Sequence, residues 1–256
     1  MLNILLSGCN GHMGQSIVGI CSELDDVQIV AGINRTAKCL NDFSVYSSCE
    51  EFSGAADVII DFSNPNNLDM LLKFIADKKI PAVLCTTGYC DEQFKSILSA
   101  SAAAPIFMSG NMSLGINLML SLVKKSAAVL GSTFDIEIIE KHHNRKIDAP
   151  SGTANMIANA AAEALETKPE YTYERSSKRC KRAKNEIGIS SVRGGNIVGE
   201  HEIIFAGQNE VLSIKHSAMS RDVFANGAIS AARYMAKITS PGLYSMDDLL
   251  KSALGE

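Results

Sequence analysis

The sequence predicts an α/β protein in two parts: an N-terminal domain built on a parallel sheet, and an α+β domain whose sheet is mainly antiparallel or mixed. Three observations lead to this prediction. In residues 1–112, short apolar runs alternate with helical patterns, which is typical of a parallel sheet covered by helices on both faces. In residues 113–221, helices and strands no longer alternate strictly. In residues 222–256 a helical pattern returns, and we expect it to pack on the first domain.

Apolar runs that end in glycine or small polar residues predict the strands of the first domain. These runs are 2–8, 27–33, 56–63, 80–88 and 105–112. Apolar residues at helical spacing predict helices at 13–24 and 66–79. Because parallel sheets bind ligands at the carboxyl ends of their strands, we expect the functional residues of this domain at those ends.

The second domain has a different order of elements. Its first three predicted elements are a helix at 113–131, a strand at 134–141 and a helix at 153–166. The runs 186–193, 199–207 and 210–217 are interpreted as antiparallel strands joined by glycine-containing turns. The polar segment 167–185 is expected to be a mobile loop, with its basic run 176–184 exposed to solvent, and 224–238 is the returning helix.

The composition is that of an ordinary globular protein. Hydrophobic residues make up 46% of the 256 residues and charged residues 20%, so a disordered chain is not expected. The net charge of −4 gives no overall attraction to nucleic acid, and no apolar run approaches the ~20 residues that span a membrane. The seven cysteines are scattered without a CxxC pair, which favours reduced thiols over a disulfide framework or a zinc site. With no recognisable signal peptide, a cytoplasmic protein is expected.

Three glycines lie between the first predicted strand and the first predicted helix: Gly8, Gly11 and Gly14 in SGCNGHMG. Glycines at such a turn let backbone N–H groups approach a pyrophosphate at the helix N-terminus. The spacing is GxxGxxG rather than GxGxxG, so a tight turn without a ligand is the alternative. The favoured interpretation is a Rossmann-like, dinucleotide-binding domain at 1–112 and 222–256.

The end of the second strand is where such a domain holds the ribose of the nucleotide. A carboxylate often binds the 2′-hydroxyl at this point, but here the residues are Asn34 and Arg35. Asn34 can hydrogen-bond a hydroxyl, and the Arg35 guanidinium can pair with a 2′-phosphate. The expected cofactor is therefore NADPH and/or NADH, with NADPH favoured; a surface arginine without a ligand is the alternative.

Two further strand ends carry small polar residues that would suit a nicotinamide carboxamide. These residues are Thr86, Thr87 and Gly88 after one strand and Ser109, Asn111 and Met112 after the next. An ordinary polar turn explains either group equally well when it is taken alone.

The segment 140–154, EKHHNRKIDAPSGTA, concentrates the titratable residues of the second domain. Its Ser151-Gly152-Thr153 turn opens a predicted helix and offers hydroxyl and N–H groups at the positive end of the helix dipole. Lys146 adds a formal positive charge. Together these groups predict a site for a carboxylate-bearing substrate, and His142 or His143 would exchange a proton with it.

Strand geometry sets a condition on the two histidines. In a continuing strand the side chains of His142 and His143 would point in opposite directions, so both reach one ligand only if the strand ends near Lys141. A metal site formed by neighbouring acids and histidines is the competing interpretation; because HExxH and similar spacings are absent, no metal is expected. His201 and His216 lie in predicted strands and are expected to be buried and hydrogen-bonded.

The same segment resembles the signature of the dihydrodipicolinate reductase family, the 4-hydroxy-tetrahydrodipicolinate reductases of bacterial lysine biosynthesis. That signature is Glu, any residue, His-His, two variable residues, Lys, any residue, Asp, any residue, then Pro-Ser-Gly-Thr-Ala, and the chain matches it throughout. Shorter matches extend over nearly the whole chain: SGCNGHMG, DFSNP, the TTG turn, SGNMSLGIN, RGGNIVGEH and SRDVFANGA.

The resemblance implies hydride transfer from NAD(P)H to a cyclic imine dicarboxylate, with His142 as proton donor and Lys146 as its assistant. Residues that would bind the substrate are His143, Lys146, Ser151, Gly152 and Thr153. Residues that would contact the cofactor are Gly8, Gly11, His12, Met13, Gly14, Asn34, Arg35, Thr86, Thr87, Gly88, Ser109, Asn111, Met112, Arg221 and Phe224. The resemblance further implies that 113–221 binds substrate and forms a homotetramer.

Three residues depart from the family pattern. Asn34 replaces the usual acid, Cys85 stands where glycine is common, and Met112 stands where an aromatic residue is common. None of them removes a reacting group, but they bear on the choice of cofactor. Two other functions compete at this point: an amino-acid dehydrogenase of similar two-domain layout, and an NADP-sensing protein without catalysis.

Overall fold

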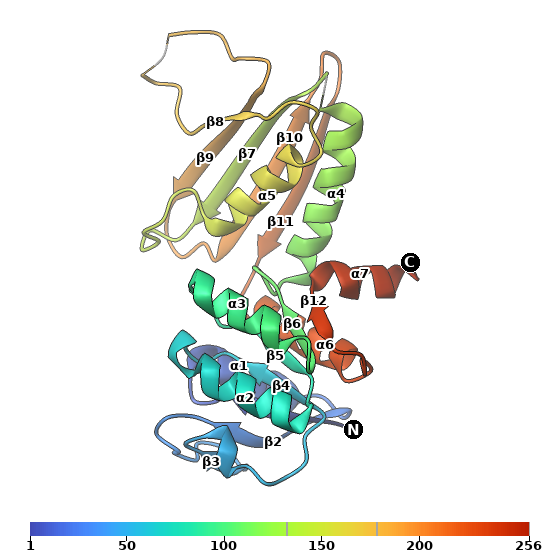
Figure 1. Ribbon diagram of the computed structural model, residues 1–256. Coiled ribbons are helices and arrows are strands. Elements are labelled where there is room, and N and C mark those ends of the chain that lie inside the picture. The colour runs from blue at the N-terminus through green and yellow to red at the C-terminus, as the bar shows by residue number, and fades with distance from the viewer. Residues whose placement is uncertain (132, 178, 256) are drawn as a thin grey trace. The chain divides into compact units, whose positions relative to one another are not determined.

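The computed structural model describes residues 1–131, 133–177 and 179–255, and the chain divides into two compact units (Figure 1). The first unit comprises Met1–Ser113 and Asp222–Glu256, and the second comprises Leu114–Arg221. The junctions fall within one residue of those expected from the sequence. The C-terminal segment returns to the first unit, as expected, because its helix contacts strands of that unit.

The described part of the first unit contains a seven-stranded sheet in the order β12-β6-β5-β4-β1-β2-β3, with every pair parallel. The strands are β1 (Leu2–Ser7), β2 (Val27–Ile33), β3 (Val45–Tyr46), β4 (Val58–Asp61), β5 (Ala82–Leu84), β6 (Pro105–Met108) and β12 (Gly242–Tyr244). All five strands predicted for this unit are confirmed. The pattern missed β3 and β12, because two or three residues are too few to show a period.

Helices cover both faces of this sheet (Figure 1). They are α1 (His12–Cys21), α2 (Leu68–Lys78), α3 (Asp91–Ala100), α6 (Asp222–Met235) and α7 (Met246–Leu254), with short 3-10 turns at Cys49–Glu51 and Pro65–Asn67. α2 and α3 pack on one face, where Leu5, Ile59 and Ile106 meet Leu71 and Ile75. On the opposite face, α6 contacts β4, β5 and β6, and α1 contacts both α6 and β2.

Helix α3 was not predicted from the sequence, and its burial explains why. Of its ten residues only Ile97 is buried, while Phe94 is 45% and Leu98 is 62% exposed. A helix that buries so little apolar surface shows no clear apolar stripe, although its acidic first turn and capping box define its start.

The second unit holds a sheet in the order β11-β10-β7-β9-β8 (Figure 1). The strands are β7 (Asp135–His142), β8 (Glu170–Thr172), β9 (Glu186–Arg193), β10 (Gly199–Ala206) and β11 (Val211–Ala218). β10 pairs antiparallel with β7 and with β11, whereas β9 pairs parallel with β7 and with β8. The expected mixed sheet is confirmed.

The expected antiparallel pairing of 186–193 with 199–207 is wrong. β7 lies between β9 and β10, so the turn after β9 crosses the end of β7 instead of closing a hairpin. An alternating pattern tells which face of a strand is buried, but it does not tell which strand lies beside it.

Helices α4 (Leu114–Leu130) and α5 (Gly152–Ala162) pack together against one face of this sheet. Ile136 and Ile138 of β7 and Phe205 of β10 point toward Val123 and Ile157 in this core. Glu140 and His142 lie on this same buried face, whereas Glu137, Ile139 and Lys141 alternate to the other face and are half exposed. Among the residues that the structure describes, no helix combines the length and hydrophobicity needed to cross a membrane.

The basic segment 176–184 was expected to be a solvated loop, but its residue Arg182 is largely buried. This side chain is only 17% exposed, and its guanidinium donates to Glu137 Oε1 (3.0 Å), Asp135 Oδ1 (2.9 Å) and the Ile136 carbonyl (3.0 Å). Gly188 leaves room for the arrangement, because any side chain there would collide with the Glu137 carboxylate. The larger segment 167–185 also contains β8, so it is not a continuous loop; Lys178 lies outside the described residues.

We predict that Arg182→Ala lowers the unfolding free energy of the second unit by roughly 2 kcal/mol, because it removes several charge-assisted hydrogen bonds at the start of β7 and β9. The exposed neighbour Lys181 provides the control. Urea unfolding followed by circular dichroism should show a lower midpoint for Arg182→Ala and an unchanged one for Lys181→Ala. Equal midpoints for both variants would contradict the role given to Arg182.

Candidate active site

The glycine loop lies at the carboxyl end of β1 and is packed too tightly for larger residues. Gly8 has a φ of +79°, and a Cβ there would lie 2.5 Å from the Phe62 carbonyl oxygen. A Cβ on Gly14 would collide with the Gly8 carbonyl and lie 2.6 Å from the Cys9 carbonyl oxygen. Gly11, the N-cap of α1, donates its N–H to the Gly8 carbonyl (3.0 Å). The loop therefore brings backbone next to the N-terminus of α1, where an anionic pyrophosphate is favoured.

The turn after β2 carries the residues expected to hold the ribose. Asn34 is fixed by its backbone N–H to the Tyr46 carbonyl (2.9 Å) and by its amide to Thr36 Oγ1 (2.9 Å). Ala37 closes the turn with an N–H bond to the Asn34 carbonyl (2.8 Å). Arg35 is exposed on this turn, so its guanidinium is accessible to a phosphate.

The carboxyl end of β5 contains a pair that the sequence did not single out. Thr86 Oγ1 donates to Asp61 Oδ2 at 2.7 Å, and Asp61, at the end of neighbouring β4, is only 1% exposed. The Thr86 proton is therefore committed to Asp61, and the hydroxyl oxygen is left to accept a hydrogen bond. Burial raises the pKa of the Cys85 thiol well above its usual value, so this residue is an inert core thiol.

The turn after β6 is held by its own side chains. Ser109 Oγ donates to the Asn111 carbonyl (2.9 Å), and Asn111 Oδ1 accepts from the Ser113 N–H (2.9 Å). Met112 is buried, and its carbonyl meets α6 so closely that a side chain at Gly227 would collide with it. Thus the β1, β2, β5 and β6 ends, which carry the expected cofactor residues, share one edge of the sheet; Phe224 lies on α6.

His142 is the last residue of β7, one residue beyond the limit expected from strand geometry. It shares a face with Glu140, and its Nδ1 lies 2.5 Å from Glu140 Oε2. His143 follows the strand, so alternation does not fix its direction. A Cβ at Gly199 would lie 3.1 Å from His142 Nε2, so glycine at this position leaves space beside that nitrogen.

Glu140 is fully buried and is held by a bidentate pair with Arg193. Arg193 Nη1 donates to Oε2 (2.8 Å) and Nη2 to Oε1 (2.6 Å), while the Ser151 N–H donates to Oε1 (3.2 Å). Burial alone would raise the pKa of Glu140, but hydrogen bonds from Arg193, Ser191 and His142 outweigh it and lower the pKa to about 2. The group is a carboxylate, so His142 Nδ1 carries the proton that it shares with Glu140.

Sequence reasoning missed Arg193 and considered Glu140 only as a metal ligand. Arg193 lies opposite His142 in the parallel pairing of β7 with β9, a pairing that the strand patterns did not predict. The signal that the sequence offered for Arg193 was an arginine at the start of the motif RGGNIVGEH. Among the described residues, no group of three or more histidine, cysteine or acidic side chains is arranged to hold a metal ion.

His143 and Lys146 lie in the turn that follows β7. Burial, then the positive charges of Arg145 and Arg221, lowers the pKa of His143. Lys146 Nζ is 2.9 Å from Asp148 Oδ1, and the Lys146 side chain is 21% exposed. Arg221, expected from the resemblance at the cofactor, is thus placed by the structure within electrostatic reach of His143 in the second unit.

The N-terminus of α5 is built by Ser151, Gly152 and Thr153. Ser151 is the N-cap: its Oγ accepts from the Ala154 N–H (3.1 Å) and lies 2.9 Å from His201 Nε2. Ser151 is 2% exposed, so its hydroxyl bonds to buried groups. Gly152 is exposed and Thr153 is half-buried. The open backbone at this helix start can bind a carboxylate.

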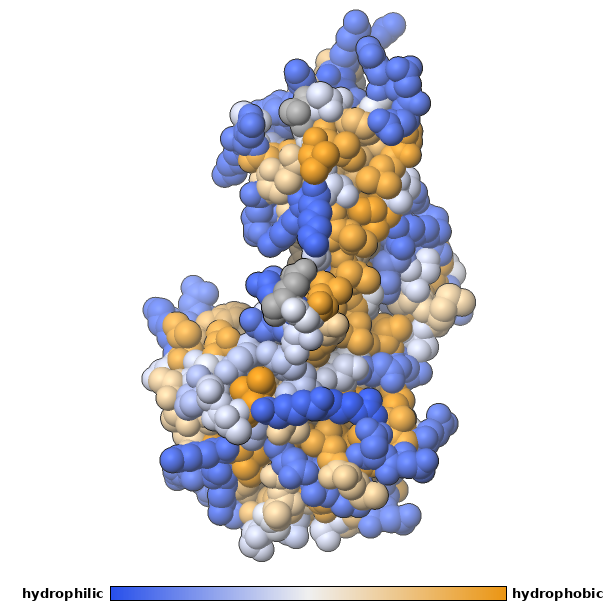
Figure 2. Space-filling model, turned by 90° about the vertical axis from the view of Figure 1, so that its right-hand side faces the viewer, coloured by the Kyte–Doolittle hydropathy of each residue, from blue (hydrophilic) through white to orange (hydrophobic). Residues whose placement is uncertain are grey.

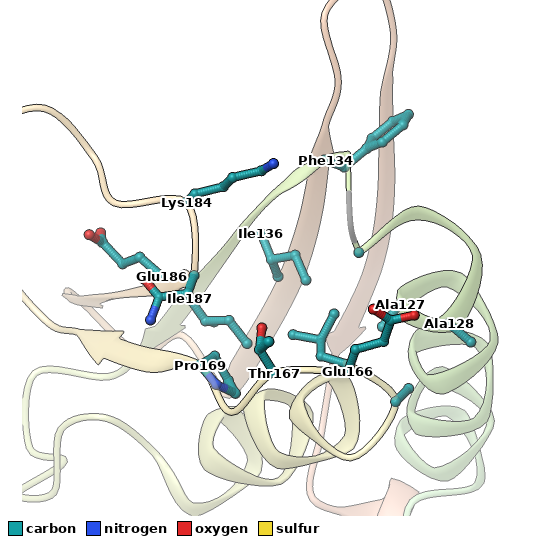
Figure 3. Close-up of a pocket in the computed structure, with 14 residues that line it drawn as sticks. Ala127, Ala128, Phe134, Ile136, Glu166, Thr167, Pro169, Lys184, Glu186 and Ile187 are labelled. Atoms are coloured by element: carbon teal, nitrogen blue, oxygen red, sulfur yellow. The ribbon is translucent and has the colours of Figure 1, made fainter.

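A separate cavity of about 130 Å³ lies in the second unit (Figure 3). It is lined by Phe134 and Ile136 near the start of β7, by Thr167, and by residues next to the start of β9. His142 stands at the other end of β7, six residues from Ile136 and so roughly 20 Å away along an extended strand. This cavity is therefore not part of the candidate active site.

We predict that Gly14→Ala weakens NADPH binding by roughly tenfold or more, about 1.4 kcal/mol, because the new methyl group displaces the Gly8 and Cys9 carbonyls. Gly19 lies on the same helix, and a Cβ there would meet nothing within 4 Å. Gly19→Ala is the matched control and should leave the dissociation constant unchanged. Fluorescence titration with NADPH measures both; equal affinities would contradict the placement of the cofactor at this loop.

Comparison with known proteins agrees with this geometry. Residues 2–112 match the family model described as dihydrodipicolinate reductase, N-terminus, and residues 115–250 match dihydrodipicolinate reductase, C-terminus. The chain is 51% identical to the 4-hydroxy-tetrahydrodipicolinate reductase of Caldanaerobacter subterraneus subsp. tengcongensis, covering 98% of this chain and 99% of that protein. It is 47% identical to the enzyme of the same name from Clostridium tetani, covering 98% of each.

Solved structures share the fold. A dipicolinate-bound dihydrodipicolinate reductase from Paenisporosarcina sp. TG-14 superposes with a TM-score of 0.81 at 23% identity, over 96% of this chain and 97% of that one. The C. glutamicum DAP dehydrogenase, in complex with DAP, superposes with a TM-score of 0.58 at 14% identity, over 100% of this chain and 98% of that one. The two-domain layout alone is therefore common to different enzymes, whereas the family models and the sequence identity are specific. The chain belongs to the dihydrodipicolinate reductase family of oxidoreductases.

Proposed function

We propose that this chain catalyses the NAD(P)H-dependent reduction of 4-hydroxy-tetrahydrodipicolinate to tetrahydrodipicolinate, in diaminopimelate and lysine biosynthesis. The observation that carries the proposal is His142, with its Nδ1 fixed by the buried Glu140 carboxylate, in the unit that also contains the open N-terminus of α5. Close relatives along the whole length of the chain are reductases of this name. The first unit serves as the dinucleotide-binding domain and the second as the substrate-binding domain.

The cofactor is held at the carboxyl edge of the first sheet, where it supplies the hydride. Backbone groups of Gly8, Gly11 and Gly14 accommodate the pyrophosphate, and Arg35 pairs with the 2′-phosphate of NADPH, which makes NADPH the favoured cofactor. Thr86, whose proton goes to Asp61, binds the carboxamide N–H of the nicotinamide through its hydroxyl oxygen. The other cofactor contacts are His12, Met13, Asn34, Thr87, Gly88, Ser109, Asn111, Met112, Arg221 and Phe224.

The substrate dicarboxylate is bound in the second unit. Gly152 and Thr153 offer N–H groups at the positive end of α5, and Lys146 and His143 add polar and charged contacts. The dipicolinate-bound relative from Paenisporosarcina supports a small dicarboxylate ligand.

His142 provides the proton. The 4-hydroxyl group of the substrate leaves as water, which places a C=C bond in conjugation with the imine, and hydride added to that C=C bond leaves an enamine. Glu140 accepts the Nδ1–H of His142 and fixes the ring, so Nε2 is the nitrogen that delivers a proton to the enamine carbon. Arg193 holds Glu140 in place and balances its charge. Lys146 assists by placing positive charge near the substrate.

The second unit also offers a surface for self-association, and we assign the chain as a homotetramer in the cytoplasm. Hydrophobic residues are exposed on the outside of α4 and on the sheet: Leu118, Leu122, Val129, Val192 and Val211 are each between 42% and 78% exposed. Figure 2 shows hydrophobic surface on this part of the molecule. Apolar surface of this kind marks protein–protein contacts.

We predict that His142→Ala mainly lowers kcat, by roughly 10²- to 10⁴-fold, because it removes the proton donor but not the carboxylate contacts. Thr153→Val should mainly raise KM for the substrate, since it removes a polar group at the α5 N-terminus. Steady-state kinetics with the dicarboxylate as the varied substrate separate the two effects. Small and equal effects from both variants would overturn the assignment of roles.

The activity itself is tested with substrate generated from aspartate semialdehyde and pyruvate, following NADPH and NADH oxidation separately. We expect NADPH to be oxidised with the lower KM, and Arg35→Ala to raise that KM by roughly tenfold while leaving the KM for NADH unchanged. No oxidation of either nucleotide by the wild-type protein would overturn the proposed function. An equal effect of Arg35→Ala on both nucleotides would overturn the NADPH preference alone.

A further inference from the structure

A row of polar side chains crosses the second sheet through β9, β7, β10 and β11, and it is buried at β7 and β10. Glu140 of β7 is paired in register with Ser191 of β9 on one side and with His201 of β10 on the other, and His201 is in turn paired with His216 of β11. Glu140 is 0% and His201 4% exposed. Burying a polar group costs free energy unless the group is hydrogen-bonded. The hydrogen-bond partners of His201 therefore indicate its structural role.

A hydrogen bond links the His201 side chain to the N-cap of α5. Its Nε2 lies 2.9 Å from Ser151 Oγ, which also accepts the Ala154 N–H. The Ser151 N–H is bound in turn by Glu140 Oε1 at 3.2 Å. The first residue of the helix is therefore attached to two adjacent strands, through its backbone to β7 and through its hydroxyl to β10.

The contact with Ser151 is the hydrogen bond that holds the His201 ring. The other ring nitrogen, Nδ1, is buried and has no hydrogen-bond partner among the described residues. One proton is shared between Nε2 and Ser151 Oγ, and in either direction the bond links the two side chains at 2.9 Å and holds the hydroxyl in place.

His201 also packs against the catalytic histidine without adding charge beside it. The rings of His201 and His142 lie with centroids 5.1 Å apart at 72°. Burial, and next the neighbouring His142, lowers the pKa of His201 to about 4. At neutral pH the ring is uncharged, so its contribution is a fixed hydrogen bond and a packed surface, not proton transfer.

We propose that His201 is a positioning residue for substrate binding: through Ser151 it fixes the first turn of α5, so that the Gly152 and Thr153 N–H groups are held ready for a substrate carboxylate. The inference rests on the proposed function in taking the ligand to be a dicarboxylate. It also gives Ser151 the role of an internal link, in place of the direct substrate contact expected from the resemblance.

Two substitutions of similar size separate this role from simple core packing. In His201→Gln the side-chain amide nitrogen reaches the place of Nε2 and can still donate to Ser151, whereas the shorter His201→Asn places its amide nearer Nδ1 and cannot. The readout is the dissociation constant of dipicolinate from the NADPH-saturated protein, measured by calorimetry. We expect His201→Asn to weaken binding roughly tenfold and His201→Gln to stay within about threefold of the wild type.

A double-mutant cycle then tests the route through Ser151. Ser151→Ala should weaken dipicolinate binding about as much as His201→Asn, and the double variant should be no weaker than either single variant, because both remove the same link. Ile203→Val, in the same strand and core but away from Ser151, controls for lost packing and should leave dipicolinate affinity unchanged. NADPH affinity, a property of the first unit, should be the same in all variants.

The outcomes distinguish this inference from the proposed function. If the wild type binds dipicolinate but His201→Gln and His201→Asn have equal affinities, or the two substitutions in the cycle act additively, the positioning role is overturned and the proposed function stands. If the wild type does not bind dipicolinate, both are overturned.

Discussion

The second unit depends on one buried ion pair. Glu140 is a carboxylate with no exposed surface, and such a group is stable in the interior only if its oxygens are fully paired. Arg193 binds both of them, and further bonds come from His142 Nδ1, the Ser191 side chain and the Ser151 N–H. A single carboxylate thereby fixes the pairing of β7 with β9 at their ends, the orientation of the His142 ring, and the start of α5. The chemistry and the fold are consequently inseparable at this point.

The first unit follows a different constraint, which is the close approach of backbone to backbone. At Gly8, Gly14 and Gly227 a side chain would meet carbonyl groups of neighbouring segments, so the loop after β1 and the packing of α6 are possible only with glycine. The edge of the sheet that carries the glycine loop is thus shaped by the absence of side chains. The candidate site of the second unit, by contrast, is shaped by hydrogen bonds and an ion pair between side chains.

Much of the fold could be predicted from the sequence, because hydrophobic period depends on local position. The strand at 27–33 was predicted with its observed limits, and the helix at 113–131 within one residue at each end. Elements that bury little surface were missed, as α3 shows. For the candidate site, the density of titratable groups in 140–154 indicated the segment. The positions of Asp61, Arg193 and His201 could not be derived, because each makes its contact with a residue 25 to 53 positions away.

By itself the sequence determined the two-part architecture, the glycine loop and the segment that carries His142 and His143, since these follow from periodicity and from motifs contiguous in the chain. Only the tertiary structure decided how that segment is organised. The strand continues through His142, β9 lies parallel to β7, and Ser151 is directed inward to His201. The physical reason is that buried polar groups take their partners from adjacent strands, and alternation along one strand contains no information about its neighbours.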